Sequence, residues 1–168
     1  MKLDLPELSS KATIWVAYSG GLDSTVLLHA LHAQGVANLR AVHVHHGLQA
    51  AADGWVRRAR DVCKGLGIPL TVKRVRVVDA GEGPEAAARA ARRAAFAALL
   101  KPGDLLATAH HRDDQAETVL LRALRGTGVA GLAAMPVLAP FAAGRLWRPL
   151  LTQPRAALRR YAERRGLG

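Results

Sequence analysis

The chain contains a single cysteine, Cys63, and no long hydrophobic run. One cysteine excludes an internal disulfide framework and a zinc site built from several cysteines. No apolar run approaches the roughly 20 residues that cross a bilayer, and the first six residues lack the apolar region of a signal peptide. We therefore expect a soluble, cytoplasmic protein with no membrane partner.

Acidic and aromatic residues are also scarce. Lys and Arg number 24 against 13 Asp and Glu, which gives a formal net charge of +11. Such a surplus suggests a polyanionic partner, because basic side chains neutralise phosphates and release counterions. A codon bias that favours Ala and Arg is the alternative explanation. Aromatic residues make up only 4% of the 168 residues, so we expect one domain with a core of Ala, Leu and Val.

Strand-like apolar runs alternate with helical patterns along the chain. This alternation predicts an α/β fold in three Rossmann-like layers, with a parallel sheet of about five strands and helices on both faces. The expected strands are residues 13–19, 39–45, 70–78, 104–109 and, more weakly, 145–148. The expected helices are residues 23–34, 53–66, 84–100, 112–125 and 154–166, and residues 126–144 are expected to form a loop.

A glycine-rich turn joins the first expected strand to the first expected helix. It consists of Ser19, Gly20, Gly21, Leu22, Asp23 and Ser24. In an open parallel sheet, ligands bind beyond the carboxyl ends of the strands. Glycines let backbone N–H groups surround an anion, and the helix N-terminus adds its positive dipole end. The turn therefore predicts a phosphate-binding loop, in which Asp23 either binds a divalent cation with the phosphates or caps the helix.

The sequence of this turn, SGGLDS, resembles the SGGxDS pyrophosphate loop (PP loop) of the N-type ATP pyrophosphatases. Members of that family split ATP between its α- and β-phosphates and activate a substrate as an adenylate. The resemblance implies a fold like that of the adenine nucleotide alpha hydrolases, ATP on residues 19–24, and Mg²⁺ at Asp23. It does not choose among members that modify tRNA, make amides or build nucleotides.

Further motifs narrow the choice. The chain carries HVHHGL at 43–48, EAAARAAR at 85–92, HHRDDQAET at 110–118 and RGTG at 125–128. In this order and spacing the set is similar to the tRNA(Ile)-lysidine synthetases, from about residue 13 to the end of the chain. The resemblance implies ATP-dependent joining of free L-lysine to the wobble cytidine of isoleucine tRNA with the CAU anticodon. The cytidine oxygen would attack the α-phosphate, and the lysine ε-amine would then displace AMP.

Two residue pairs are candidates for this chemistry. Arg89 and Arg92 lie three residues apart and share a helix face, where they are either solvated or stabilise the leaving pyrophosphate or the adenylate. Asp114 and Glu117 are also three apart and form an acidic pair. Their ordinary role would be to favour the helix dipole, but the resemblance places lysine recognition at these positions.

Histidines follow two of the expected strands. His46 and His110 are expected to position the nucleotide or substrate, although packing is an alternative for each. A metal is less favoured at the pair formed by His110 and His111, because no third ligand is spaced for zinc.

The sequence departs from the family pattern in two ways. Arg93 stands where the family usually has a tyrosine, and family members continue into C-terminal domains that grip the tRNA. We therefore expect residues 1–168 to be the PP-loop catalytic domain alone, without those tRNA-binding domains. Two alternatives stay open. One is another PP-loop tRNA-modifying enzyme, such as a thiolase, although thiolases commonly carry cysteine pairs. The other is a nucleotide-binding module without catalysis.

Overall fold

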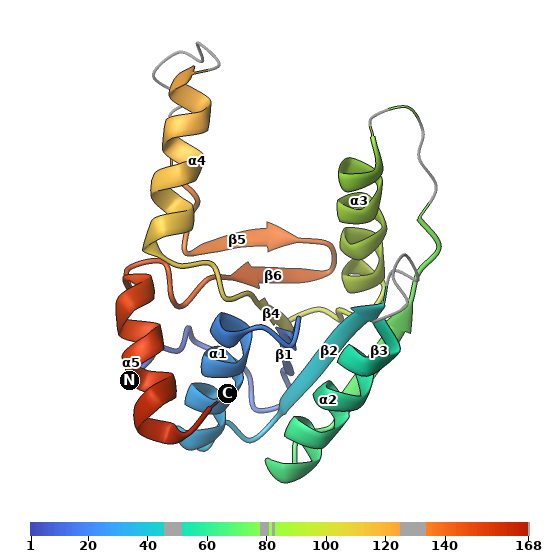
Figure 1. The fold of residues 1–168 in the computed structure, drawn as a ribbon. Helices are drawn as coiled ribbons and strands as arrows, with labels where there is room; N and C mark the ends of the chain where they lie inside the picture. The colour runs from blue at the N-terminus through green and yellow to red at the C-terminus, as the bar shows by residue number, and fades with distance from the viewer. Residues whose placement is uncertain (46–51, 78–80, 82, 125–133, 168) are drawn as a thin grey trace.

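The computed structural model describes the chain except residues 46–51, 78–80, 82, 125–133 and 168 (Figure 1). Its centre is a six-stranded sheet in the order β3-β2-β1-β4-β6-β5. The strands are β1 (Ile14–Ala17), β2 (Leu39–His45), β3 (Leu70–Arg74), β4 (Leu105–Ala107), β5 (Leu138–Phe141) and β6 (Gly144–Trp147). The helices are α1 (Leu22–Ala33), α2 (Ala52–Gly65), α3 (Pro84–Ala97), α4 (Arg112–Leu124) and α5 (Arg155–Arg165).

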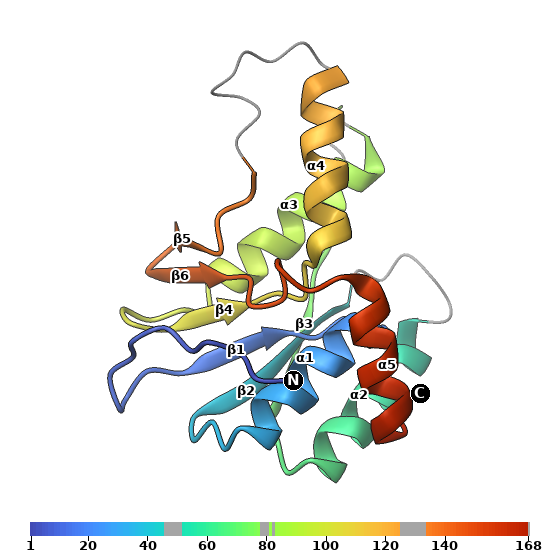
Figure 2. The same ribbon diagram turned by 90° about the vertical axis from the view of Figure 1, so that its left-hand side faces the viewer.

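Helices cover both faces of the sheet, as the sequence predicted (Figures 1 and 2). Helices α1, α2 and α5 pack on one face over a core that includes Val16, Leu27 and Leu158. Helix α3 covers the other face, where Phe96 packs with Trp15 and Leu106. Helix α4 rises away from the sheet beside the β5–β6 hairpin, and no residue of its described length is fully buried. No helix in the described part of the chain is long and apolar enough to cross a membrane.

Five of the strands are parallel, and these are the five that the sequence predicted. The prediction missed β5, which pairs antiparallel with β6 at the edge of the sheet inside the expected loop 126–144. Pro140 lies in β5, and a proline is tolerated there because an edge strand leaves one row of N–H positions unpaired. The third strand was also predicted too long, since it ends at Arg74 rather than at residue 78.

The strand order reverses between β1 and β4. From β1 the chain adds β2 and β3 on one side, and it then crosses to place β4 on the other side. These two neighbours are paired in register, with Val16 opposite Ala107. The loops that leave their carboxyl ends therefore diverge over opposite faces, which leaves the ligand-binding crevice typical of such sheets.

Candidate nucleotide-binding site at the carboxyl edge of the sheet

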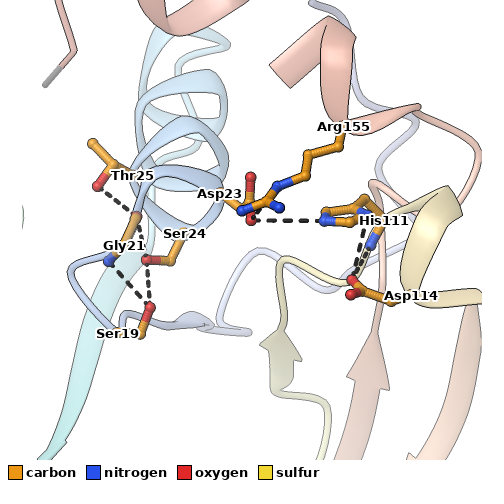
Figure 3. Close-up of polar contacts among 8 residues, drawn as sticks. All are labelled: Ser19, Gly21, Asp23, Ser24, Thr25, His111, Asp114 and Arg155. Atoms are coloured by element: carbon orange, nitrogen blue, oxygen red, sulfur yellow. Dashed lines mark hydrogen bonds and ion pairs between the residues drawn. The ribbon is translucent and has the colours of Figure 1, made fainter. Parts of the chain in front are cut away.

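The loop at residues 19–24 is held by its own serines (Figure 3). The Gly21 N–H donates to Ser19 Oγ at 3.2 Å, and Ser19 Oγ lies 3.0 Å from Ser24 Oγ. Ser24 Oγ in turn donates to the Gly21 carbonyl oxygen at 2.9 Å, and Thr25 Oγ1 donates to the same oxygen at 3.0 Å. At Gly20 the backbone has φ +86°, a value that L side chains rarely adopt. These bonds and this conformation fix a tight turn between β1 and α1.

Helix α1 begins at this turn without a side-chain cap. Its N-cap is Gly21, and no side chain in the described part of the chain bonds to the first N–H groups of the helix. Asp23 lies in the first turn but does not serve as the cap, which was its ordinary alternative role. The unsatisfied N–H groups and the helix dipole make this end of α1 an anion-binding position.

Asp23 instead faces an imidazole ring and a guanidinium group (Figure 3). Its Oδ2 lies 3.7 Å from Nε2 of His111, which follows β4, and 3.9 Å from Nε of Arg155, the first residue of α5. Its Oδ1 is buried and has no hydrogen-bond partner in the described part of the chain. The residues that follow β4 and begin α5 therefore face one oxygen of this carboxylate, and the other oxygen has no partner among the described residues.

A cavity of about 760 Å³ opens beside the loop. The loop and Asp23 form one wall, and the carboxyl ends of β2 and β4 form the floor with His45 and Thr108. Trp55 of α2 lines it next to Gly20, where its Cε3 would lie 3.4 Å from a Cβ added to that glycine. The three arginines of α3 line the opposite wall, at positions 89, 92 and 93.

The predicted arginine pair lies in this cavity. Both Arg89 and Arg92 line it, and burial, together with the charge of Arg89, lowers the pKa of Arg92. Guanidinium groups facing a helix N-terminus across a cavity can hold a chain of phosphates between them.

His110 also lines the cavity. Its Nδ1 lies 2.9 Å from Thr108 Oγ1, which orients the ring. Burial lowers the pKa of His110, and the charge of Arg148 lowers it further, while Asp114 acts in the opposite direction. The neutral imidazole is therefore favoured at neutral pH. His46, the other predicted histidine, lies outside the described residues.

The predicted acidic pair lies on α4, outside the cavity lining. Asp114 Oδ2 accepts a hydrogen bond from the His111 N–H at 2.8 Å and lies 3.5 Å from Nδ1 of the same ring. Glu117, one turn further along α4, is exposed. His111 thus lies between two carboxylates, Asp23 and Asp114 (Figure 3).

Comparison with known proteins shows the family to which this chain belongs. The sequence profile of the PP-loop domain matches residues 2–168, which is nearly the whole chain. The chain belongs to the PP-loop domain family. Its SGGLDS turn, called the PP loop below, and the residues that line the cavity beside it lie within the matched range.

Relatives with high sequence identity are named tRNA(Ile)-lysidine synthase. The protein of that name from Xanthomonas campestris pv. campestris (strain 8004) is 62% identical over 156 residues, covering 90% of this chain and 36% of the relative. The one from Pseudomonas aeruginosa is 57% identical over 152 residues, covering 88% of this chain and 34% of the relative. The chain thus spans about a third of the length of these curated relatives.

A solved structure supports the fold. The U34-tRNA thiolase NcsA from Methanococcus maripaludis, solved with its [4Fe-4S] cluster, superimposes with a TM-score of 0.74 at 22% identity. The match covers 95% of this chain and 59% of that one. At this identity the likeness concerns the fold alone.

The residues around the PP loop fit a Mg²⁺ ion carried in with ATP. Asp23 Oδ1 is a buried carboxylate oxygen without a hydrogen-bond partner among the described residues, and Mg²⁺ prefers such oxygens together with phosphate oxygens and water. No group of three metal-ligating side chains occurs in the described part of the chain. Among the described residues, Asp23 would therefore not be one of three protein ligands, and phosphate oxygens and water would complete the coordination of the ion.

Sequence reasoning gave no role to several residues around the PP loop. Trp55 and Phe141 line the cavity, and Arg155 contacts Asp23, but none of them belongs to a recognised motif. His111 was noted only as half of a histidine pair. Its position inside HHRDDQAET was the available signal, because the Asp114 in the same motif fixes its backbone.

Proposed function

We propose that this chain is the ATP-binding catalytic part of a tRNA(Ile)-lysidine synthase. It would ligate free L-lysine to the wobble cytidine of isoleucine tRNA with the CAU anticodon and release AMP and pyrophosphate in the cytoplasm. The observation that carries the proposal is the 62% identity, over 156 residues, with the Xanthomonas protein of that name. The cavity beside the PP loop supports it, since ATP must be held with its α-phosphate accessible.

In the first step the cytidine carbonyl oxygen attacks the α-phosphate of ATP, and pyrophosphate leaves. The PP-loop N–H groups and the uncapped N-terminus of α1 would hold the phosphates on one side. Arg89 and Arg92 would face them from α3 and stabilise the charge that develops on the leaving pyrophosphate.

Asp23 would hold the Mg²⁺ that accompanies ATP. Bound there, the ion would neutralise phosphate charge and polarise the phosphoryl oxygens. His111 and Arg155 both face Oδ2 of Asp23, and Oδ1 would be the oxygen that binds the ion, because it has no hydrogen-bond partner among the described residues.

In the second step the lysine ε-amine displaces AMP from the activated cytidine. Asp114 and Glu117 would bind the lysine ammonium groups at the base of α4, near His110 at the cavity wall. The attacking amine must be neutral, so it loses a proton before the carbon–nitrogen bond forms.

A sulfur-transfer enzyme is the nearest alternative within the family. None of the residues lining the cavity is a cysteine, and Cys63 is buried in the core, where burial raises its pKa to about 11. A thiolate at the site is therefore not supplied by the described residues of this chain.

The proposal is tested by ATP–pyrophosphate exchange with and without isoleucine tRNA, followed by incorporation of labelled lysine. We expect exchange that depends on this tRNA, and lysine transfer to it. ATP binding without tRNA-dependent exchange would instead identify a nucleotide-binding module without catalysis. Exchange without lysine incorporation would identify a different PP-loop reaction.

A further inference from the structure

Helix α4 carries the two carboxylates proposed to bind lysine, but apolar packing does little to hold it. No residue of its described length is fully buried, and Leu120, Leu121 and Leu124 are exposed. In Figures 1 and 2 the helix rises away from the layers that cover the sheet. Most helices in proteins are held by packing of an apolar face, so a helix without such packing depends on its polar contacts. The position of α4 therefore depends on its hydrogen bonds.

Gln115, in the first turn of α4, holds the segment that leads into β5. Its Nε2 donates to the Met135 carbonyl oxygen at 2.9 Å, and its Oε1 accepts the Met135 N–H at 2.7 Å. Pro136 follows Met135, and a residue before proline favours an extended backbone. An extended residue turns its N–H and its carbonyl oxygen to the same side, as in a hydrogen-bonded pair of antiparallel strands. The Gln115 amide thus pairs with Met135 as a neighbouring strand would.

The same segment is joined to the end of β6. Arg148 directly follows this strand, and its Nη1 donates to the Pro136 carbonyl oxygen at 2.7 Å. At the last residue of the strand, the Trp147 carbonyl oxygen accepts the Thr108 N–H at 2.9 Å, and Thr108 lines the cavity. The segment therefore links Gln115 to the edge of the sheet beside the cavity.

A pair of attachments near its start orients α4. The Arg112 N–H donates to the Gln153 carbonyl oxygen at 2.9 Å. A helix attached at one point can pivot and turn about its axis, and the Gln115 side chain supplies a second point. Because successive residues are separated by about 100° around a helix, fixing Gln115 also fixes the directions of Asp114 and Glu117.

We propose that Gln115 is a positioning residue for the lysine substrate. Its two bonds to Met135 set the direction in which α4 presents Asp114 and Glu117. This inference rests on the proposed function, which places the lysine ammonium groups at those carboxylates. Gln115 does not line the cavity, and its amide is engaged with Met135. Its loss should therefore weaken the use of lysine without removing a contact to ATP.

The test is Gln115→Met, which keeps a side chain of similar length but removes the amide. Gln34 provides a matched control, because it makes the same two bonds to one backbone residue. Its Oε1 accepts the Leu3 N–H at 2.7 Å, and its Nε2 donates to the Leu3 carbonyl oxygen at 3.0 Å. Gln34 is the C-cap of α1, at the end of that helix opposite the PP loop. Gln34→Met therefore removes an equivalent pair of bonds away from the site.

Lysine incorporation into isoleucine tRNA, ATP–pyrophosphate exchange and thermal unfolding are measured for both variants. Both should unfold at a lower temperature, by similar amounts. Gln115→Met alone should raise the lysine concentration needed for half-maximal incorporation by about tenfold, since a displaced binding group loses much of its effect. The rate at saturating lysine and the exchange of pyrophosphate should stay within about twofold of the wild type. Gln115→Glu, which keeps the acceptor but not the donor, should show a smaller rise.

Two results would overturn the inference and leave the proposed function standing. If Gln115→Met raised the lysine requirement no more than Gln34→Met, Gln115 would have only a structural role. If Gln115→Met slowed pyrophosphate exchange as strongly as it raised the lysine requirement, α4 would orient the ATP site instead.

Two other results would overturn the lysine part of the proposed function together with this inference. One is a wild-type chain that incorporates no lysine. The other is a pair of variants, Asp114→Asn and Glu117→Gln, that need no more lysine than the wild type.

Discussion

At the scale of single residues, Gly20 is the position where the PP loop most depends on glycine. Its φ of +86° lies in the region that costs an L side chain about 1–2 kcal/mol, and a Cβ there would lie 3.4 Å from Trp55 Cε3. We expect Gly20→Ala to lower the free energy of unfolding by about that amount. Gly21→Ala is the control: with φ −79° and an ordinary 3.5 Å contact to Ser19 Oγ, it should change stability by less than about 0.5 kcal/mol. Urea denaturation of the two variants measures the difference, and equal stabilities would contradict the positive φ at Gly20.

Asp23 can be tested through the dependence of ATP binding on Mg²⁺. Asp23→Asn keeps the shape of the side chain but removes the charge. The factor by which Mg²⁺ increases ATP affinity should therefore be at least about tenfold smaller in the variant than in the wild type, as expected when one ion–carboxylate contact is removed. Asp113→Asn, at an exposed position in the first turn of α4, is the control. An Asp23→Asn variant with the Mg²⁺ dependence of the parent would show that Asp23 does not bind the ion and serves only as the partner of His111 and Arg155.

Asp114 and Glu117 of α4 should have similar effects on the lysine requirement but different effects on stability. Removing the charge in Asp114→Asn or Glu117→Gln should raise the lysine requirement about tenfold to a hundredfold, since a charged hydrogen bond contributes roughly 1.5–3 kcal/mol. Adenylation should be largely spared. Asp114→Ala should also lower stability by about 1 kcal/mol, because it removes the acceptor of the His111 N–H at the start of α4, whereas Glu117→Ala should not.

Kinetics of both steps and denaturation curves for the four variants check these expectations. If adenylation collapsed while the lysine requirement stayed unchanged, the pair would belong to the ATP or metal site instead.

At the scale of structural elements, the β5–β6 hairpin contains one glycine that a side chain could not replace and one alanine at a position that favours glycine. Gly144 begins β6 so close to the Asp104 carbonyl oxygen that a Cβ would overlap it, and Ala142 in the turn has φ +51°. Gly144→Ala should destabilise the protein by about 1–3 kcal/mol through overpacking. Ala142→Gly should stabilise it by up to about 1 kcal/mol, because glycine accepts a positive φ. Thermal or urea unfolding separates the two, and shifts in the same direction would show that the hairpin adjusts without regard to these contacts.

The same hairpin marks the limit of prediction from the sequence. The parallel strands and all five helices were predictable, because apolar runs and helical periodicity are local signals. β5 was not, since Leu138–Phe141 is short, contains Pro140 and gains its strand character only by pairing with β6. The PP loop was predictable because its six residues are consecutive in the sequence.

The environment of Asp23 shows the corresponding limit for the site. Its contacts with His111 and Arg155 join segments that are far apart in the sequence. Local residue patterns do not tell which strand will lie next to β1, so they could not predict these two contacts. They depend on the reversal of strand order and on the docking of α5 against α1, where His29 Nδ1 lies 2.9 Å from the Tyr161 hydroxyl.

At the scale of the whole molecule, the net charge of +11 should dominate RNA binding by this chain. Phosphate contacts carry no sequence information, so affinity should fall at least about tenfold between 50 and 200 mM salt, with little difference between isoleucine tRNA and other tRNAs. Filter binding with both kinds of tRNA measures this. Tight binding that salt barely changes, or clear selectivity, would show that the 168 residues contain a specific recognition surface of their own.

The reversal of strand order between β1 and β4 has a consequence for the order in which the molecule can fold. Ser24 completes the PP loop early in the chain, but Asp23 reaches its neighbours only after β4 and α5 have docked. Contacts between such distant segments must first overcome the entropy of closing a long loop, which slows their formation. ATP therefore finds no finished site on a nascent or half-folded chain. During refolding, the capacity to bind nucleotide should arise in the last kinetic phase, when the final helix is in place.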